Sequence, residues 1–292
     1  MRVRIVRACD LPAVAREDWV DTNRRAVVQD GVAYVPVKKG ERHDLIIPER
    51  KPYRGRGYQL LGDLALVHGD RPTPGEVDDI RDWLNPRGII WVSGIAGIER
   101  APYVEVISGS AGEVHHKEYG CTFLLDPTRV MYAMGNLSER HRIADLVKEK
   151  GGDERVGDLF AGIGYFSIPL ARAGCTVHAM EISPVAFGYL LRNIHENAVS
   201  DQVLAEYGNC RDLLRGEYDR LILGHFDALD YLPLALSHAR AGSVLHLHTL
   251  RDESDRIGPL AREAGFTAAI TTRRVKSYAP HTWHMVQDVA LS

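Results

Sequence analysis

One turn restricts the possible folds of this chain more than any other feature: the segment VGDLFAGIGYF at residues 156–166. A strand-like run ends at Asp158, a tight glycine turn follows, and a helical pattern begins near Tyr165. Gly162 and Gly164 allow backbone angles and a close approach of a ligand that a Cβ atom would block. A strand, a glycine turn and a helix in this order are typical of nucleotide-binding α/β proteins.

The C-terminal half continues this alternation, which predicts an α/β fold of the Rossmann type: an open, doubly wound sheet with right-handed crossovers. Two strand-like segments with no helix between them, 267–275 and 284–291, surround a turn at 278–280 and predict a terminal hairpin with one antiparallel strand at the sheet edge. The other predicted strands are 156–160, 176–181, 202–206, 220–223 and 243–247, and the predicted helices are 165–173, 184–197, 229–240 and 254–264.

The N-terminal half predicts a smaller α+β domain over residues 57–145, followed by the ligand-binding domain over 146–292. Its clearest element is a helix with a capping box, in which Thr73 is the N-cap, Pro74 the first helical residue and Glu76 the partner of the cap. The other expected elements of this half are strands at 31–37, 44–48, 59–67, 89–92, 103–107 and 122–125, a linker at 51–57 and a helix over 127–150.

Composition and charge exclude several classes of protein. With 45% apolar and 26% charged residues, and with apolar runs no longer than a strand, we expect a soluble cytoplasmic protein without a membrane span. The four cysteines form no CxxC pair, so we expect neither a metal site nor a disulfide scaffold. Residues 1–56 hold 13 Lys and Arg against 8 Asp and Glu, whereas the whole chain holds 36 against 39. This basic segment of unknown role suggests a polyanionic partner, and a solvated charged face is the alternative.

Two details of the glycine turn point to S-adenosylmethionine. Ser167 stands where the dinucleotide fingerprint needs its third glycine, and Asp158 lies four residues before Gly162. Such a carboxylate would repel a pyrophosphate and attract the cationic ammonium and sulfonium of S-adenosylmethionine. Glu181 would then accept hydrogen bonds from both ribose hydroxyls, and Asn209 one from the adenine amine. The alternatives are a nicotinamide or flavin dinucleotide, a purely structural turn, and a neutral turn residue at Asn209.

Further segments make the chain recognisable by family. It resembles the archaeal wyosine-type tRNA aminocarboxypropyltransferases, which have a class I methyltransferase fold and are close relatives of the tRNA guanine-N1 methyltransferases. The resemblance begins near residue 57, and the segments that carry it, besides the glycine turn, are HKEYGC (116–121), MGNLSERHR (134–142), LGH (223–225), LHLH (245–248) and YAPHTWH (278–284).

The resemblance implies transfer of the 3-amino-3-carboxypropyl (acp) group of S-adenosylmethionine to C7 of 4-demethylwyosine in phenylalanine tRNA, with methylthioadenosine as by-product. It also implies that Arg140, Glu181, Asn209 and Cys210 bind the cosubstrate, together with Asp158, Phe160, Gly162 and Gly164 of the turn. Two positions depart from the family: Asn209-Cys210 replaces a common Asp-Asn, and Ala133 replaces a Ser. The first departure should weaken adenine binding without abolishing it.

The type of group transferred depends on which carbon of the sulfonium faces the nucleophile. Amine methyltransferases have Asn-Pro-Pro-Tyr after the fourth strand, and the guanine-N1 relatives have a similar Asn-x-Pro. The corresponding segment here is Leu223-Gly224-His225-Phe226-Asp227, which argues against methylation. The alternatives kept open are a tRNA guanine-N1 methyltransferase and a non-catalytic RNA-binding protein that senses the cosubstrate.

Roles in catalysis follow from position. His225, at the carboxyl end of the fourth strand, is the candidate base that removes the ring proton, and a histidine that lines the groove or stacks on the substrate is the alternative. His246 and His248 share one face of the fifth strand, where a hydrogen-bonded core histidine is the commoner outcome. Arg140 would clamp the cosubstrate carboxylate, and a helix-surface salt bridge is the alternative.

Basic and aromatic residues alternate in two segments, which suits contact with phosphates and with a splayed base of the tRNA. Lys117 and Tyr119 lie in the first segment, and Lys276 and Tyr278 in the C-terminal one; solvated charge is the alternative for each. Trp283 is either a stacking platform or part of the core. A monomer is favoured, and no membrane partner is expected.

Overall fold

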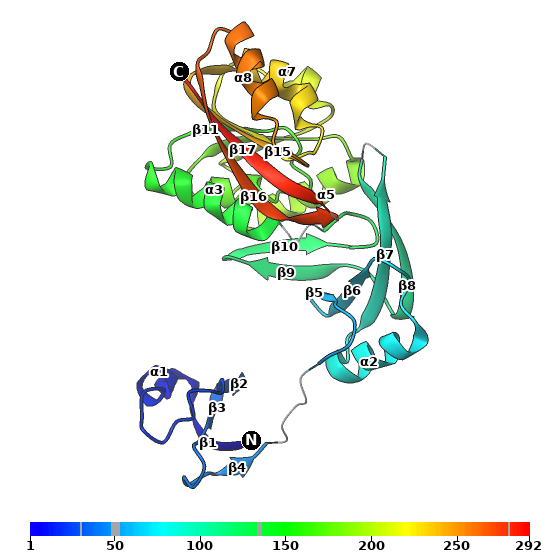
Figure 1. The fold of residues 1–292 in the computed structure, drawn as a ribbon, viewed down its shortest axis with the longest axis vertical. Coiled ribbons are helices and arrows are strands. Elements are labelled where there is room, and N and C mark those ends of the chain that lie inside the picture. The colour runs from blue at the N-terminus through cyan, green and yellow to red at the C-terminus, as the bar shows by residue number, and fades with distance from the viewer. Residues whose placement is uncertain (30, 48–52, 98, 133–135, 280) are drawn as a thin grey trace. The chain divides into compact units, whose positions relative to one another are not determined.

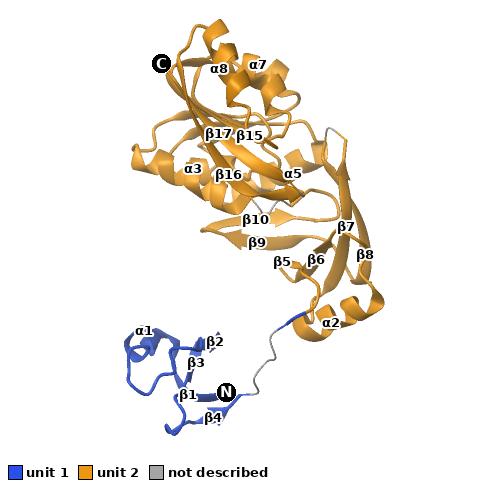
Figure 2. Cartoon of the chain, in the orientation of Figure 1, with its two compact units in different colours: residues 1–54 blue, residues 55–292 orange. Residues whose placement is uncertain are grey.

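The structure, a computed structural model, describes residues 1–292 except 30, 48–52, 98, 133–135 and 280. Its internal contacts group the chain into two compact units, residues 1–54 and 55–292 (Figure 2). The predicted domain boundaries, including the one at residue 145, stay predictions. Ala133, residues 51–52 of the expected linker and Pro280 of the expected turn lie outside the described residues. Within the described part, no helix is long and apolar enough to cross a membrane.

The first unit is a small antiparallel sheet with strand order β2-β3-β1-β4. It has a core of its own, in which Val20, Ala33 and Val35 are buried. The predicted strands at 31–37 and 44–48 correspond to β3 and β4. The elements of this unit are β1 (Arg2–Arg7), η1 (Ala8–Asp10), α1 (Leu11–Val14), β2 (Val27–Gln29), β3 (Val32–Pro36) and β4 (Leu45–Ile46).

The second unit begins with a four-stranded sheet of order β5-β6-β7-β8, a helix α2 and a separate hairpin β9–β10. The capping box is confirmed: Thr73 Oγ1 accepts from the Glu76 backbone N–H, and the Glu76 carboxylate accepts from the Thr73 backbone N–H at 2.8 Å. The elements are β5 (Gln59–Leu61), β6 (Leu64–His68), α2 (Pro74–Leu84), β7 (Gly88–Ala96), β8 (Ala101–Gly109), β9 (Val114–Glu118) and β10 (Cys121–Leu125).

The helix predicted over 127–150 is shorter than expected, because α3 spans only Leu137–Glu149. Asp126 accounts for part of the difference. Its Oδ1 accepts from both the backbone N–H and the hydroxyl of Thr128, at 2.9 and 2.7 Å, and this fixes a local turn in place of a helical start.

The rest of the second unit is a seven-stranded sheet of order β13-β12-β11-β14-β15-β17-β16 (Figure 1). The first five strands in this order are parallel, and β17 pairs antiparallel with both β15 and β16, which confirms the predicted terminal hairpin. The predicted place of the antiparallel strand at the sheet edge is wrong, because β17 lies between β15 and the edge strand β16. The elements are β11 (Arg155–Asp158), α4 (Ser167–Arg172), β12 (Thr176–Glu181), α5 (Pro184–Glu196), β13 (Val203–Tyr207), α6 (Cys210–Leu213), β14 (Tyr218–Leu223), η3 (Ala228–Tyr231), α7 (Leu232–Ser237), β15 (Ala239–Thr249), α8 (Ser254–Glu263), β16 (Ala268–Ala279) and β17 (Thr282–Leu291).

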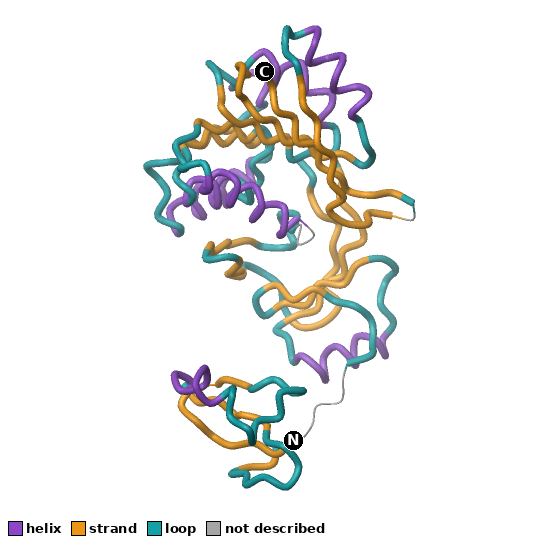
Figure 3. The backbone as a smooth tube through the Cα atoms, turned by 60° about the vertical axis from the view of Figure 1, so that its left-hand side comes forward, coloured by secondary structure: helices purple, strands orange, loops and turns teal. Residues whose placement is uncertain are grey.

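Helices cover both faces of this sheet (Figures 1 and 3). Strand β14 shows why, since its side chains alternate between the two faces. Ile222 belongs to the core formed with α3, α4 and α5, whereas Leu221 and Leu223 belong to the core formed with α7 and α8. A strand that is apolar on both faces needs a helical layer on each, which is the doubly wound arrangement predicted from the sequence.

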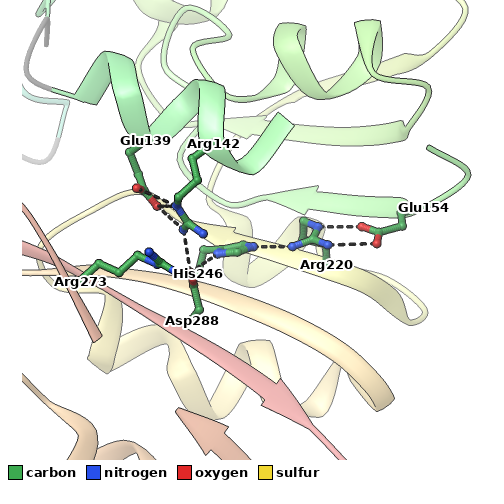
Figure 4. A network of polar contacts seen from close by, with 7 residues as sticks. All are labelled: Glu139, Arg142, Glu154, Arg220, His246, Arg273 and Asp288. Atoms are coloured by element: carbon green, nitrogen blue, oxygen red, sulfur yellow. Dashed lines mark hydrogen bonds and ion pairs between the residues drawn. The ribbon is translucent and has the colours of Figure 1, made fainter. Parts of the chain in front are cut away.

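A buried polar network crosses the sheet and fixes α3 to it (Figure 4). Arg220 donates two hydrogen bonds to the Glu154 carboxylate and one to His246 Nε2, and His246 Nδ1 donates to Asp288 at 2.6 Å. Arg142 of α3 then binds Asp288 at 2.9 Å. The expectation of a hydrogen-bonded core histidine is therefore confirmed for His246. Because buried charges are stable only when paired, the network determines how α3 lies on the sheet.

Candidate functional site

A cavity of about 430 Å³ opens at the carboxyl ends of the parallel strands. Its walls come from residues at or just after the carboxyl ends of β11, β12, β13 and β14, namely 159–163, 181–183, 208–210 and 224–225. The strand order reverses between β11 and β14, and ligands of doubly wound sheets bind at such a point. Residues of the β7–β8 turn and of α3 close the remaining side.

Glu181 holds the glycine turn in place. Its carboxylate accepts hydrogen bonds from the backbone N–H groups of Gly162 and Ser183, both at 2.7 Å. Gly162 has a φ of 59°, in the left-handed region that favours glycine. Burial raises the pKa of the Glu181 carboxyl group despite these donors. Glu181 and Gly162 both line the cavity, and each carboxylate oxygen has a second lone pair for a ligand hydroxyl.

The carboxylate of Asp158 is fully buried and lies outside the cavity lining. Ser167 donates its hydroxyl to Asp158 Oδ2 at 2.7 Å. The serine that replaces the third glycine therefore has a structural role that sequence reasoning missed. Burial raises the pKa of the Asp158 carboxyl to about 6. The contact of this carboxylate with a cationic cosubstrate stays a prediction.

Gly164 also lies outside the cavity lining, and it serves packing. Its φ is 99°, and an added Cβ would come within 2.7 Å of Ile168 Cδ1 and 3.1 Å of Leu190 Cδ1. The glycine thus lets the turn approach α4 and α5 closely. Phe160, by contrast, lines the cavity and contacts Tyr231 edge-to-face at 4.9 Å between ring centroids.

Asn209 and Cys210 lie where the sequence placed them, on the cavity wall after β13. The amide oxygen of Asn209, however, accepts from the Arg211 backbone N–H at 3.0 Å and so caps α6. An adenine amine would have to share that oxygen with the cap. Cys210 is 4% exposed, and burial raises the pKa of its thiol to about 11, so the side chain contributes a neutral, apolar surface.

Arg140 lines the cavity but already has a carboxylate partner. Its Nη1 donates to Glu118 Oε1 at 2.8 Å, and its guanidinium lies 3.9 Å from the ring centroid of Tyr165. Both charged side chains are almost fully buried. Glu118 belongs to the HKEYGC segment, so part of that motif positions Arg140 inside the protein. No local sequence pattern predicts this pair, because its members lie 22 residues apart on different elements.

A second cavity, of about 570 Å³, adjoins the first. The two share Gly97, Arg100, Met131 and His225, and the aromatic side chains of the second cavity are Tyr132, Phe226 and Tyr278. An aromatic cavity that opens onto a nucleoside-sized one suits a planar base. Arg100 was not predicted as a site residue, since one arginine in a short turn between two strands has no distinguishing local pattern.

His225 lines both cavities. Its Nδ1 accepts from the Asp227 backbone N–H at 3.2 Å, so the neutral ring carries its proton on Nε2. Burial and the nearby charge of Arg100 lower the pKa of the imidazole, which favours the neutral form at pH 7. The ring is placed to donate a hydrogen bond. A general-base role stays a prediction, and it would require the Nδ1 contact to break.

The four residues expected to contact tRNA fall into two groups. Lys117 and Tyr119 are exposed on the β9–β10 hairpin, where the Tyr119 ring packs against His141. Tyr278 lines the second cavity and packs against Phe226 at 5.1 Å between centroids. Lys276 is half-buried on the same strand, and burial together with the charges of Arg140 and Arg100 lowers its pKa.

Two other aromatic positions are settled by the geometry. Trp283 is 40% exposed and has the guanidinium of Arg274 5.1 Å from its ring centroid, so it is not a core residue. His248 and His284 are buried together, 2.9 Å apart between ring nitrogens, and burial lowers both pKa values. No group of three or more His, Cys, Asp or Glu residues in the described ranges is arranged to hold a metal ion.

Comparison with known proteins decides the family. A model described as the TRM5/TYW2 methyltransferase domain matches residues 114–269. The chain belongs to this family. A TRM5/TYW2 relative from Methanocaldococcus jannaschii, the tRNA(Phe) (4-demethylwyosine(37)-C(7)) aminocarboxypropyltransferase, is 33% identical over 247 residues, which are 80% of this chain and 97% of that protein. The resemblance stated from the sequence is confirmed.

Solved structures of the TRM5/TYW2 family have the same fold. TYW2 of Pyrococcus horikoshii, in complex with MeSAdo, superposes with a TM-score of 0.70 at 27% identity and covers 82% of this chain and 92% of its own. Trm5b of Pyrococcus abyssi gives a TM-score of 0.73 at 24% identity over 99% of both chains. The second likeness concerns the fold alone. Together they confirm the predicted class I methyltransferase architecture.

Proposed function

We propose that this chain transfers the acp group of S-adenosylmethionine to C7 of 4-demethylwyosine in phenylalanine tRNA. The observation that carries the proposal is the 33% identity to the Methanocaldococcus jannaschii aminocarboxypropyltransferase across 97% of that protein. The cavity agrees with it, since Glu181 is available to ribose hydroxyls and Asn209 and Cys210 form the wall where an adenine would lie. The Pyrococcus horikoshii TYW2 complex with MeSAdo supports the same cosubstrate.

The reaction needs positioning more than acid–base assistance. The electron-rich C7 attacks the γ-carbon of the methionine moiety, and a C–C bond forms as the C–S bond breaks. The bonding pair stays on sulfur, so the sulfonium becomes the neutral thioether of methylthioadenosine. The ring, now cationic, loses its C7 proton to a base or to water. A sulfonium is already a good leaving group, so no metal is required for this step.

The turn after β14 favours acp transfer over the methyltransferase alternative. Gly224 and His225 line the cavity where an Asn and a Pro would hold an amine during methylation. A Cβ on Gly224 would lie 3.6 Å from Phe166 Cε2, an ordinary contact, so this glycine leaves the wall open without being required by close packing. The Trm5b likeness shows a shared fold and does not favour methylation.

Contact with tRNA involves the second cavity and its rim in this proposal. Tyr278 and Phe226 supply ring faces for a base turned out of the anticodon loop, and the half-buried Lys276 beside them supplies positive charge. Lys117 and Tyr119 on the β9–β10 hairpin are further proposed contacts. We also propose that the protein acts in the cytoplasm as a monomer.

Two labelled samples of S-adenosylmethionine test the proposal. Purified protein is incubated with phenylalanine tRNA that carries 4-demethylwyosine, and the label is placed either in the carboxyl or in the methyl group. We expect carboxyl label in the tRNA and methyl label only in methylthioadenosine. Methyl label in the tRNA would establish the methyltransferase instead, and binding without any transfer would establish a non-catalytic protein.

A pair of variants connects that result to the cavity. Glu181→Ala should abolish transfer by weakening cosubstrate binding, because its carboxylate both holds the turn and faces the ligand. Glu149→Ala, at the exposed end of α3, is the matched control and should transfer at the wild-type rate. Equal activity of both variants would contradict the placement of the cosubstrate.

A further inference from the structure

The two cavities meet at a point that carries one half-buried positive charge. Gly97, Arg100, Met131 and His225 line both of them, and Arg100 is the charged member of this group at neutral pH. A reaction between a molecule in one cavity and a molecule in the other has to take place where the cavities join. The side chains at the junction therefore decide which atom of the cosubstrate faces the acceptor base.

Within the described part of the chain, Arg100 forms no ion pair with a carboxylate, and the charge of Asp227 acts on it only from a longer distance. The contacts of its guanidinium are Met131 Sδ at 3.4 Å and the ring of Phe226, whose centroid is 5.5 Å away. Its Nε is buried without a hydrogen-bond partner among the described residues. Burial lowers the pKa of this side chain, which is the sign of an ion that the protein desolvates without full compensation. Such a group is stabilised when a ligand brings an anion.

The other arginines of the first cavity are less suited to bind an anion. Nη1 of Arg140 is bonded to the buried carboxylate of Glu118, which neutralises its charge. Arg129 lines the same cavity but is exposed to solvent, where an ion pair contributes little. Arg100 thus combines burial, a position at the junction and an unsatisfied donor.

We infer that Arg100 binds the α-carboxylate of S-adenosylmethionine and thereby turns the γ-carbon of the methionine arm toward the second cavity. The carboxylate is the one anionic group of that molecule, and a guanidinium binds it with two parallel hydrogen bonds. Anchoring the end of the arm at the junction places the carbons between carboxylate and sulfur beside the acceptor. The inference rests on the proposed function for the identity of the cosubstrate, and it assigns to Arg100 the clamp that the sequence analysis expected of Arg140.

Binding measurements without tRNA test this inference. Methylthioadenosine has the adenosine and the sulfur of S-adenosylmethionine but lacks the acp arm, so the ratio of the two dissociation constants reports on contacts to that arm. Measured by calorimetry, the Arg100→Ala substitution should weaken the binding of S-adenosylmethionine by about 10- to 100-fold. This is the range for the loss of a charged hydrogen-bonding partner. The dissociation constant of methylthioadenosine should change by less than about twofold, because this ligand lacks the arm that carries the carboxylate.

Two further variants make the result specific. Arg100→Met keeps an unbranched side chain beside Met131 and Phe226 and should give the same selective loss, even if the alanine variant folds poorly. Arg262→Ala, in the exposed last turn of α8 and outside both cavities, is the control and should leave both dissociation constants unchanged. An equal loss of affinity for both ligands in the Arg100 variants, or the same selective loss of affinity for S-adenosylmethionine in Arg262→Ala, would overturn the inference.

The outcome is separable from that of the proposed function. Wild-type protein that transfers no carboxyl label to tRNA would contradict the proposed activity. If Arg100→Met then still has a selectively lower affinity for S-adenosylmethionine than for methylthioadenosine, the carboxylate site stands. If wild-type protein transfers the label and both Arg100 variants bind the two ligands as it does, the activity stands and the carboxylate site fails.

Discussion

At the scale of single residues, the buried carboxylate of Asp158 lowers the stability of the folded protein at neutral pH. The carboxyl is fully buried with a pKa of about 6, against an ordinary value of 3.8. Above about pH 6 the carboxyl group is ionised in both the folded and the unfolded state. The folded state then bears the full free-energy cost of burying a charged carboxylate. Below about pH 4 it is protonated in both states and the cost disappears. This residue therefore makes the protein less stable as the pH rises from about 4 to 6.

Asp158→Asn should remove that dependence. We expect its free energy of unfolding, relative to wild type, to rise by about 2–3 kcal/mol between pH 4 and pH 7, from the size of the shift. Urea denaturation at several pH values measures the difference. Asp201→Asn, on the exposed turn before β13, is the control. If the difference in the free energy of unfolding between variant and wild type stays constant with pH, the pKa of Asp158 is not raised by burial.

Single residues also show what local sequence can reveal. The capping box at Thr73 and the glycine turn involve neighbours within a few positions, and both were predicted correctly. The Arg140–Glu118 pair and the junction arginine Arg100 depend on elements that meet only in the folded chain. Asn209 lies between these cases, because its position was predicted while its use as a helix cap was not.

At the scale of elements, the glycine turn controls how closely α4 and α5 approach β11. Gly164→Ala places a Cβ 2.7 Å from Ile168 at a φ of 99°. We expect a loss of about 2–4 kcal/mol in the free energy of unfolding, from backbone strain and overpacking together. Gly188→Ala, inside α5 with no atom within 4 Å of the added Cβ, should instead gain about 0.5–1 kcal/mol.

Denaturation curves of the two glycine variants check this expectation side by side. Similar stabilities would show that α4 and α5 yield to the extra methyl group at little cost. The strands and most helices of this region were predictable because hydrophobic periodicity and caps are local. The start of α3 was not, because an Asp126 side chain that captures Thr128 competes with the helix.

At the scale of the whole molecule, the first unit is the part least explained by the proposed chemistry. It has its own sheet and its own small core, and 80% of this chain accounts for 97% of the Methanocaldococcus jannaschii relative. Both cavities are built entirely from the second unit. We therefore expect the chemical step not to require residues 1–54, whose excess of Lys and Arg suits an RNA backbone.

Deletion of residues 1–54 separates these two contributions. We expect the dissociation constant of S-adenosylmethionine to stay within about twofold of wild type, because no cavity residue is removed. The KM for tRNA should rise by about tenfold or more, with kcat nearly unchanged, since loss of phosphate contacts weakens binding uniformly. Raising the salt concentration should shrink the difference between the two proteins, because the missing contacts are electrostatic. A deletion variant with unchanged KM at low salt would exclude the basic unit from tRNA binding, and one with weakened cosubstrate binding would show that the two units are coupled.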